Sequence, residues 1–236
     1  ETMKDLVKSY SNTVSEAKKA NIKLDGYSDT WVNSTKPLTQ EQIRMFSNFR
    51  MVSENQKLLL NLLISYDPET AYQFFIQIPD FPRNSSDSGY YSSYQPRIVE
   101  ALLEKNKTEK ALEIAHEMLN KEFSSTYIDI LRRIYKKDSV KGRELVEETL
   151  QKIKSATDYK VTTYLLNLFF DRVSETVETN PKAAMLSEKS LRELANLLGK
   201  FALTKYDVNN PWVLEEVARK INKYSPQQSL QIRQEL

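Results

Sequence analysis

The chain has 236 residues, of which 28% are charged and 40% hydrophobic, and its formal net charge at pH 7 is +2. A chain of this length can bury a large core, in one or two domains. With so small a net charge, it lacks the excess of basic residues that is typical of nucleic-acid-binding proteins. The chain contains no Cys, which excludes disulfides, thiolate catalysis and cysteine-based metal sites.

Apolar periodicity and capping residues predict an all-α chain, because Val, Ile and Thr never alternate with polar residues over a useful length. The low content of Gly and Pro, 4 and 8 residues, fits long helical stretches. We predict about twelve helices. In chain order they span roughly 3–20, 40–50, 52–65, 68–78, 96–105, 108–121, 125–136, 139–154, 157–178, 187–203, 211–224 and 226–236.

We predict that these helices form a single helical-repeat domain over residues 1–236. It begins with an N-terminal helix and a polar linker over 1–38 and continues as an array of helix pairs over 39–236. The polar segment 79–96 interrupts the array as a loop insertion. Because the chain begins with Glu1 and not with Met, we expect a missing upstream segment: a removed signal peptide, a tag or another domain.

A sequence pattern recurs four times along the array, starting at Asp67, Lys107, Asp138 and Ser225. A small residue follows four positions after each start, and an apolar residue seven positions after it. The small residues are Ala71, Ala111, Gly142 and Ser229, and the apolar ones are Phe74, Ile114, Leu145 and Ile232. A weaker copy starts at Asn180. Small residues let two helix backbones approach closely, so the pattern predicts an α-α superhelix, or solenoid, of antiparallel helix pairs.

Capping residues mark the predicted helix starts. In four dipeptides a residue able to accept hydrogen bonds from free backbone N–H groups precedes a Pro at the first helical position. These dipeptides are Asp67-Pro68, Asn180-Pro181, Asn210-Pro211 and Ser225-Pro226. The stretches "TQEQ" (39–42) and "SLRE" (190–193) add two capping-box patterns, which indicate further helix starts.

Two long runs carry a resemblance: "ALEIAHEMLNKEFSSTYIDILRRIYKKDSVKGRELVEETLQKIK" (111–154) and "INKYSPQQSLQIRQEL" (221–236). With their D-P-x-x-A-x-x-L pattern they resemble uncharacterised, predicted exported helical-repeat proteins of bacteria, of the Acidobacteria type. The resemblance implies a helical-repeat fold and an extracytoplasmic or secreted setting, and it implies no activity. More distantly, the helix pairs are similar to tetratricopeptide-type repeats, but the Trp, Gly and Tyr positions of that consensus are not reproduced.

The insertion "NSSDSGYYSSYQP" contains three clustered tyrosines, Tyr90, Tyr91 and Tyr94. Tyrosines among Ser, Gly and Asn are typical of adaptable binding loops, since they give a large contact area at low entropic cost. They are therefore the candidate residues for partner binding. Two alternatives stay open: the tyrosines pack onto the groove of the array itself, or the insertion is a mobile tether.

A basic stretch, "LRRIYKKDSVKGR" (131–143), provides a second candidate site. On a helix, Arg132 with Lys136 and Arg133 with Lys137 form two basic rows at i,i+4 spacing. Such rows could bind RNA or another anionic polymer. The favoured interpretation is a solvated outer face near a helix C-terminus, where the helix dipole favours positive charge.

Possible catalytic or metal-ligating residues are few. His116 is the only histidine, and Glu113-x-x-His116 has the spacing of di-iron bundles, but the sequence lacks the second copy that such a site needs. Carboxylates at helical spacing could form a glycosidase-like pair, although they look like ordinary solvated helix faces. They are Asp171, Glu175, Glu178, Glu144, Glu147 and Glu148. The sequence contains no nucleophile elbow, P-loop or dinucleotide fingerprint.

These observations favour a non-enzymatic interaction or scaffold module with a protein or peptide partner, without cofactor or metal and without a membrane span. The first alternative is a polysaccharide-acting all-α enzyme that uses a carboxylate pair together with aromatics such as Trp31 and Trp212. An RNA-binding solenoid is the less favoured alternative, because nucleic acid is not the partner that the charge balance indicates.

Overall fold

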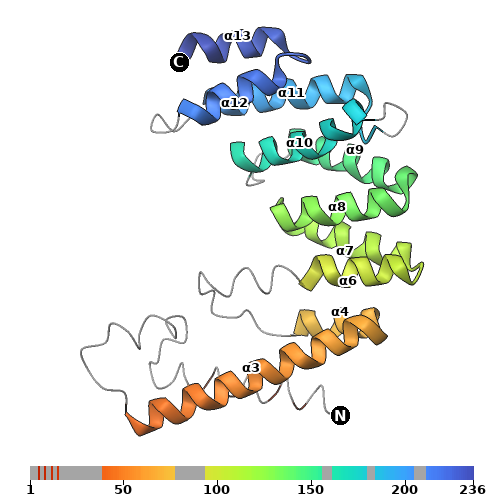
Figure 1. Cartoon of the computed structure of the whole chain (residues 1–236), viewed down its shortest axis with the longest axis vertical. Helices are drawn as coiled ribbons and strands as arrows, with labels where there is room; N and C mark the ends of the chain where they lie inside the picture. The colour runs from red at the N-terminus through yellow and green to blue at the C-terminus, as the bar shows by residue number, and fades with distance from the viewer. Residues whose placement is uncertain are drawn as a thin grey trace. The chain divides into compact units, whose positions relative to one another are not determined.

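We analysed a computed structural model of the chain (Figure 1). The structure describes residues 39–77, 94–155, 161–179, 184–204 and 211–236, and of the first 38 residues only Asp5, Lys8, Asn12 and Ser15. Within this described part all regular structure is helical, in ten helices. The prediction of an all-α fold is confirmed. The four described positions of the predicted helix 3–20 are helical and exposed, and the rest of it lies outside the described residues.

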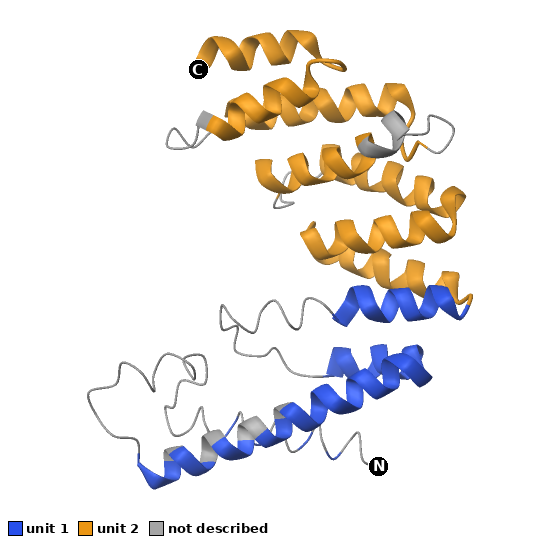
Figure 2. Ribbon diagram, viewed as in Figure 1, with its two compact units in different colours: residues 1–105 blue, residues 106–236 orange. Residues whose placement is uncertain are grey.

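The chain divides into two compact units, Glu1–Lys105 (unit 1) and Asn106–Leu236 (unit 2), which Figure 2 shows in different colours. Each unit has its own buried apolar side chains. In unit 1 these include Leu60 and Phe74, and in unit 2 they include Phe123 and Phe169, whose rings meet edge to face with centroids 5.6 Å apart. That all helices belong to a single repeat domain stays a prediction.

Unit 1 contains three described helices that pack on one another: α3 (Gln40–Tyr66), α4 (Pro68–Gln77) and α6 (Tyr94–Glu104). The sequence suggested two helices over 40–65, and this was wrong, because α3 is a single helix of 27 residues. No Gly or Pro occurs within it to stop a helix, whereas Pro68 restricts the residue before it and ends the helix at Tyr66.

Unit 2 contains seven helices within its described residues, from α7 to α13 (Figure 1). They are α7 (Thr108–Lys121), α8 (Ser125–Lys137), α9 (Ser139–Ser155), α10 (Thr163–Thr179), α11 (Glu188–Thr204), α12 (Pro211–Ile221) and α13 (Pro226–Glu235). Successive helices α7 with α8, α8 with α9, and α10 through α13 pack together. Contacts also join alternate helices, as in α8 with α10, α9 with α11 and α11 with α13.

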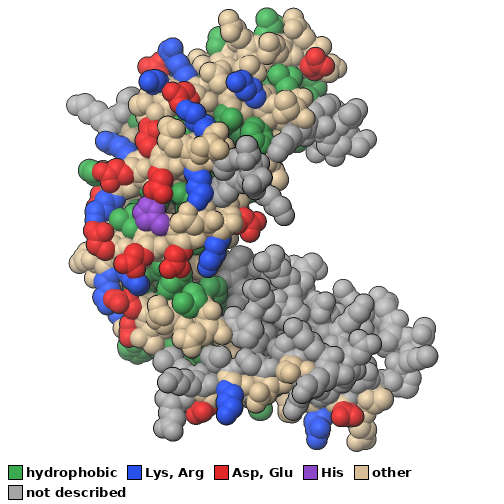
Figure 3. Space-filling view, turned by 180° about the vertical axis from the view of Figure 1, so that it is seen from behind, with side chains coloured by type: hydrophobic (Ala, Val, Ile, Leu, Met, Phe, Trp, Pro, Cys, Tyr) green, Lys and Arg blue, Asp and Glu red, His purple; other side chains and the backbone are tan. Residues whose placement is uncertain are grey.

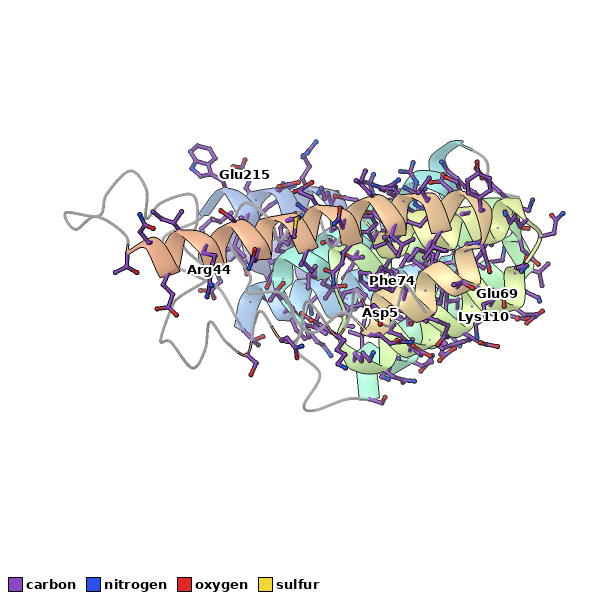
Figure 4. All side chains as sticks on the ribbon, turned by 90° about the horizontal axis from the view of Figure 1, so that it is seen from below. Asp5, Arg44, Glu69, Phe74, Lys110 and Glu215 are labelled. Atoms are coloured by element: carbon purple, nitrogen blue, oxygen red, sulfur yellow. The ribbon has the colours of Figure 1, made fainter. Side chains whose placement is uncertain are left out.

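The positions of the sequence pattern are buried. The small residues Ala71, Ala111, Gly142 and Ser229 are all buried, and so are the apolar residues Phe74, Ile114, Leu145 and Ile232. Figure 4 labels Phe74 on α4. The close approach expected at the small positions is confirmed at Gly142, where an added Cβ would lie 2.4 Å from the Cα of Tyr135 on α8. The repeat itself stays a prediction.

The predicted caps have mixed outcomes. Asp67 caps α4 as expected, since its Oδ1 accepts from the Thr70 N–H at 3.3 Å. The helix start predicted at Ser225-Pro226 is confirmed, since Ser225 is the N-cap residue of α13, but its hydroxyl makes no capping bond and instead donates to Asn196 Oδ1 at 2.5 Å. The "SLRE" prediction was misplaced, because α11 begins at Glu188 and the Ser187 hydroxyl accepts from the Ser190 N–H. Asn180 and Asn210 lie outside the described residues.

Among the residues that the structure describes, no helix has the length and apolarity needed to cross a membrane. Even α3, the longest at 27 residues, carries polar and charged side chains along its length.

Candidate functional site

The first candidate surface is a row of exposed apolar side chains on α3, which we call the α3 stripe. It consists of Met51, Leu58, Leu62 and Tyr66, whose side chains are 58%, 61%, 58% and 79% exposed. Their spacings of seven, four and four residues place them on one face of the helix. From Met51 to Tyr66 this face runs about 22 Å along the helix axis. Leu58, Leu62 and Tyr66 thus form an unbroken exposed apolar row, and Met51 lies two turns before it.

The opposite face of α3 is buried and holds the helix in unit 1. Val52, Leu60 and Ile64 lie in the core on this side. Helix α6 adds two polar bonds to α3: Arg97 Nη1 donates to Asn61 Oδ1 at 2.9 Å, and Lys105 Nζ donates to the backbone oxygen of Tyr66 at 2.6 Å. The α3 stripe is therefore presented by a helix whose other side is fixed.

The second candidate surface is an open pocket of about 540 Å³ between α12 and α13, which we call the Trp212 pocket. Its lining residues are Trp212, Glu215, Arg219, Arg233 and Leu236. The first three are spaced at i, i+3 and i+7 and therefore share one face of α12. The indole of Trp212 is 76% exposed, and the Glu215 side chain lies at the outer edge of α12 (Figure 4). A volume of this size is typical of ligand pockets.

Both arginines of the Trp212 pocket have unused hydrogen-bond donors. Within the described part of the chain, neither the Arg219 nor the Arg233 guanidinium makes a hydrogen bond or ion pair, and Glu215 makes none either. Arg219 acts on Glu216 only through its field, which helps to lower the pKa of that carboxyl after the larger effect of Lys220. The side chains of the pocket thus carry two positive charges and one negative charge.

Lys220 fixes the base of α12 to α10. Its Nζ donates to Asn167 Oδ1 at 3.2 Å and to Asp171 Oδ2 at 2.7 Å, and it pairs with Glu216 at 2.5 Å. Burial disfavours the charged form of Lys220, but the bonds to Asp171 and Glu216 outweigh this effect and raise its pKa above the ordinary value. The hydrogen bond that Lys220 donates to Glu216 also lowers the pKa of the Glu216 carboxyl.

Replacing Lys220 with Met is expected to lower the free energy of unfolding at pH 7 by about 1 kcal/mol, since the ion pairs are partly exposed. The contribution of Glu216 is present above the ordinary glutamate pKa of about 4.3 and is lost as pH falls through its lowered folded value. The contribution of Lys220 is present below the ordinary lysine pKa of about 10.4 and is lost as pH rises through its raised folded value. Urea unfolding followed by circular dichroism between pH 3 and pH 11 measures the loss of stability at low pH and at high pH.

A matched control for this prediction is Lys141→Met. Lys141 also pairs with a glutamate, Glu109, but this pair is more exposed than the Lys220 pairs and is a single one, so its loss is expected to change the unfolding midpoint less. Equal pH profiles for wild type and Lys220→Met would contradict the linkage assigned to Lys220.

The predicted tyrosine site is only partly described. Tyr90 and Tyr91 lie outside the described residues, so their role as contact residues stays a prediction. Tyr94 forms the start of α6 and is completely buried, with the Arg97 guanidinium 5.4 Å from its ring centroid. A fully buried ring has no surface to offer a partner. Tyr94 therefore fits the alternative in which a tyrosine packs against its own unit.

The predicted basic rows lie on α8 as expected. Lys136 and Lys137 are exposed in the last turn of the helix, where positive charge is favourable. Arg132 and Arg133 are half-buried, and each has an interaction within the protein. Figure 3 shows acidic and basic side chains mixed over the visible face. Anion binding by these four residues stays a prediction.

His116 and three of the candidate carboxylates, Glu147, Glu148 and Asp171, have partners within the protein. His116 Nδ1 lies 3.3 Å from Glu148 Oε2, and Glu113 pairs with Lys110. Glu147 accepts a hydrogen bond from Ser190 at 2.7 Å, and Asp171 pairs with Lys220. Among the described residues, no three His, Asp or Glu side chains come close enough to hold a metal ion. The side chains of Glu175 and Glu178 are not described.

Sequence reasoning missed both candidate surfaces as sites. The α3 stripe could have been found from its helical spacing, but the division of 40–65 into two helices placed Met51 between them. For the Trp212 pocket, the sequence suggested only the aromatic Trp212. The i,i+3,i+7 spacing to Glu215 and Arg219 was visible, whereas the arrival of Arg233 depends on how α13 packs against α12.

Comparison with known proteins gave no match: no protein-family model, no curated protein and no solved structure is significantly similar to the chain.

Proposed function

We propose that the chain is a helical-repeat interaction module that binds a protein partner through the α3 stripe. The single observation that carries the proposal is the exposed apolar face of α3, lying opposite a face that is buried in unit 1. Exposed apolar side chains grouped along one helix face are typical of surfaces that bind another protein. The proposed occupant is an amphipathic helix of the partner, because α3 presents its apolar residues at the spacing that helix pairs use.

The packing of neighbouring helices in unit 2 supports the repeat part of this proposal. In unit 2 each described helix packs on neighbours close in sequence, and alternate helices also touch, as expected when helix pairs stack into an α-α superhelix. The small residues of the sequence pattern are buried, as such stacking requires. Solenoids are built from these local contacts and commonly serve as binding scaffolds. We therefore favour a scaffold or adaptor role over catalysis or RNA binding, both of which stay as alternatives.

The test is a comparison of partner binding by the wild type and by Leu58→Ser/Leu62→Ser. Proteins retained by the immobilised wild-type chain would be identified, purified and titrated by calorimetry against both forms. Because covering one Leu side chain contributes about 1.5–3 kcal/mol, we expect the double variant to bind at least about tenfold more weakly. Both residues are exposed, so the variant should keep the circular dichroism spectrum and unfolding midpoint of the wild type.

The matched control is Ile76→Ser/Val140→Ser, which removes two exposed apolar side chains outside the α3 stripe. It should bind the partner like the wild type. If both double variants bind with wild-type affinity, or if no partner is retained, the proposal is wrong. Sedimentation velocity of the wild type checks for a second copy of the chain as occupant, which would show as a concentration-dependent dimer lost in Leu58→Ser/Leu62→Ser.

A further inference from the structure

We infer that the Trp212 pocket binds an acidic peptide segment in which a carboxylate side chain stands about three residues from an aromatic or other large apolar one. This inference rests on the proposed interaction function and deepens it, because it names the chemistry of a ligand at a site in unit 2.

The apolar part of the ligand follows from Trp212. Its indole lines the pocket, and Trp212 is 76% exposed. An exposed tryptophan at a concave site is the kind of side chain that dominates binding energy when covered, because it offers a large rigid surface at little entropic cost. Leu236 adds further apolar surface to the same pocket.

The acidic part follows from Arg219 and Arg233. A guanidinium presents several donors in a fixed plane that matches the two oxygens of a carboxylate. Neither of these two groups makes a hydrogen bond or ion pair within the described residues, so both are available to a ligand. Glu215 gives the pocket a single opposing charge, which disfavours a strongly polyanionic ligand and can accept hydrogen bonds from peptide N–H groups.

The spacing follows from the helix. Trp212 and Arg219 are seven residues apart on α12, which corresponds to about 10 Å along the axis. An extended peptide advances about 3.3 Å per residue, so about three residues separate the groups that contact the two side chains. The pocket volume of about 540 Å³ accommodates a short segment and leaves the rest of the peptide in solvent.

The experiment uses the full chain with Trp31→Phe, which leaves Trp212 as the only tryptophan and as the fluorescent reporter. The probes are the acetylated, amidated peptides Gly-Glu-Phe-Glu-Leu-Glu-Gly and Gly-Gln-Phe-Gln-Leu-Gln-Gly, titrated at low and at physiological salt. We expect the Glu peptide to change Trp212 emission and to bind about tenfold or more tightly than the Gln peptide, with affinity falling as salt rises.

Two variants locate the binding. Arg219→Gln/Arg233→Gln should reduce affinity for the Glu peptide about tenfold or more and leave the Gln peptide little changed. Lys121→Gln/Lys189→Gln removes two exposed cations of unit 2 outside the pocket and the basic rows, and this variant should bind the Glu peptide like the wild type. Both pairs lie on the surface, so circular dichroism should show an unchanged helix content.

Several outcomes would overturn the inference: equal binding of the two peptides, no response of Trp212, no effect of Arg219→Gln/Arg233→Gln, or competition by inorganic phosphate at the same concentration as the peptide. None of these outcomes bears on the α3 stripe. If partner binding still depends on Leu58 and Leu62 when the peptide test fails, the proposed function stands and only the peptide site is wrong. If the Glu peptide binds as expected but Leu58→Ser/Leu62→Ser binds the partner like the wild type, the peptide site stands and the role of the α3 stripe is wrong.

Discussion

Replacing Gly142 with Ala is expected to lower the free energy of unfolding by about 2 kcal/mol. An Ala Cβ at this position would lie 2.4 Å from Tyr135 Cα and 2.7 Å from Tyr135 Cβ, so α8 and α9 would have to move apart. Overfilling a packed core typically costs about 1–3 kcal/mol and sometimes more, while the higher helix propensity of Ala returns about 1 kcal/mol. Because the nearest atom belongs to the backbone, no side-chain rotation relieves the clash.

Urea unfolding of the wild type and Gly142→Ala measures this cost, and Gly199→Ala is the matched control. At Gly199 an added Cβ would lie 2.8 Å from Gln228 Cβ, a smaller overlap than the 2.4 Å to Tyr135 Cα at Gly142, and 3.1 Å from Ile221 Cδ1, the end of a flexible side chain. Because the required shift is smaller and the gain in helix propensity offsets about 1 kcal/mol of its cost, we expect the control to lose about 1 kcal/mol or less. A Gly142→Ala protein as stable as the control would show that α8 and α9 do not pack this closely.

Gly142 also shows how much of the fold the sequence predicts. The pattern of a small residue followed three positions later by an apolar one was enough to predict that Gly142 and Leu145 are buried. The boundary between α3 and α4 at Asp67-Pro68 was also predicted correctly, because a Pro and a capping carboxylate act on the backbone next to them. Local chemistry therefore predicts most helices of the described part.

Features that depend on tertiary packing were not predictable. Ser225 has the sequence context of a cap, yet its hydroxyl donates a hydrogen bond to Asn196 on α11. Nothing near Ser225 in the sequence indicates this partner. The Trp212 pocket depends in the same way on the arrival of Arg233 from α13. For α3, the predicted helix break at Met51 was wrong, and the helix continues because neither Gly nor Pro occurs there.

Replacing Thr149 with Val is expected to lower the free energy of unfolding by about 2 kcal/mol, more than replacing Tyr127 with Phe. Both residues are completely buried, and their hydroxyl oxygens are 2.5 Å apart. The Thr149 hydroxyl donates to the Leu145 backbone oxygen at 2.7 Å, so the Tyr127 hydroxyl is the donor to Thr149. Thr149→Val therefore removes the acceptor of the buried Tyr127 hydroxyl. Taking the acceptor from a buried donor costs about 1–3 kcal/mol.

Tyr127→Phe removes the donor and leaves Thr149 bonded to Leu145, so its expected cost is only about 1 kcal/mol. In the double variant the unsatisfied hydroxyl is gone, and its stability should lie close to that of Tyr127→Phe alone. A double-mutant cycle by urea unfolding measures the coupling, expected at about 1 kcal/mol or more. Strictly additive costs would show that the two hydroxyls do not interact, and a larger loss for Tyr127→Phe than for Thr149→Val would reverse the assigned direction of donation.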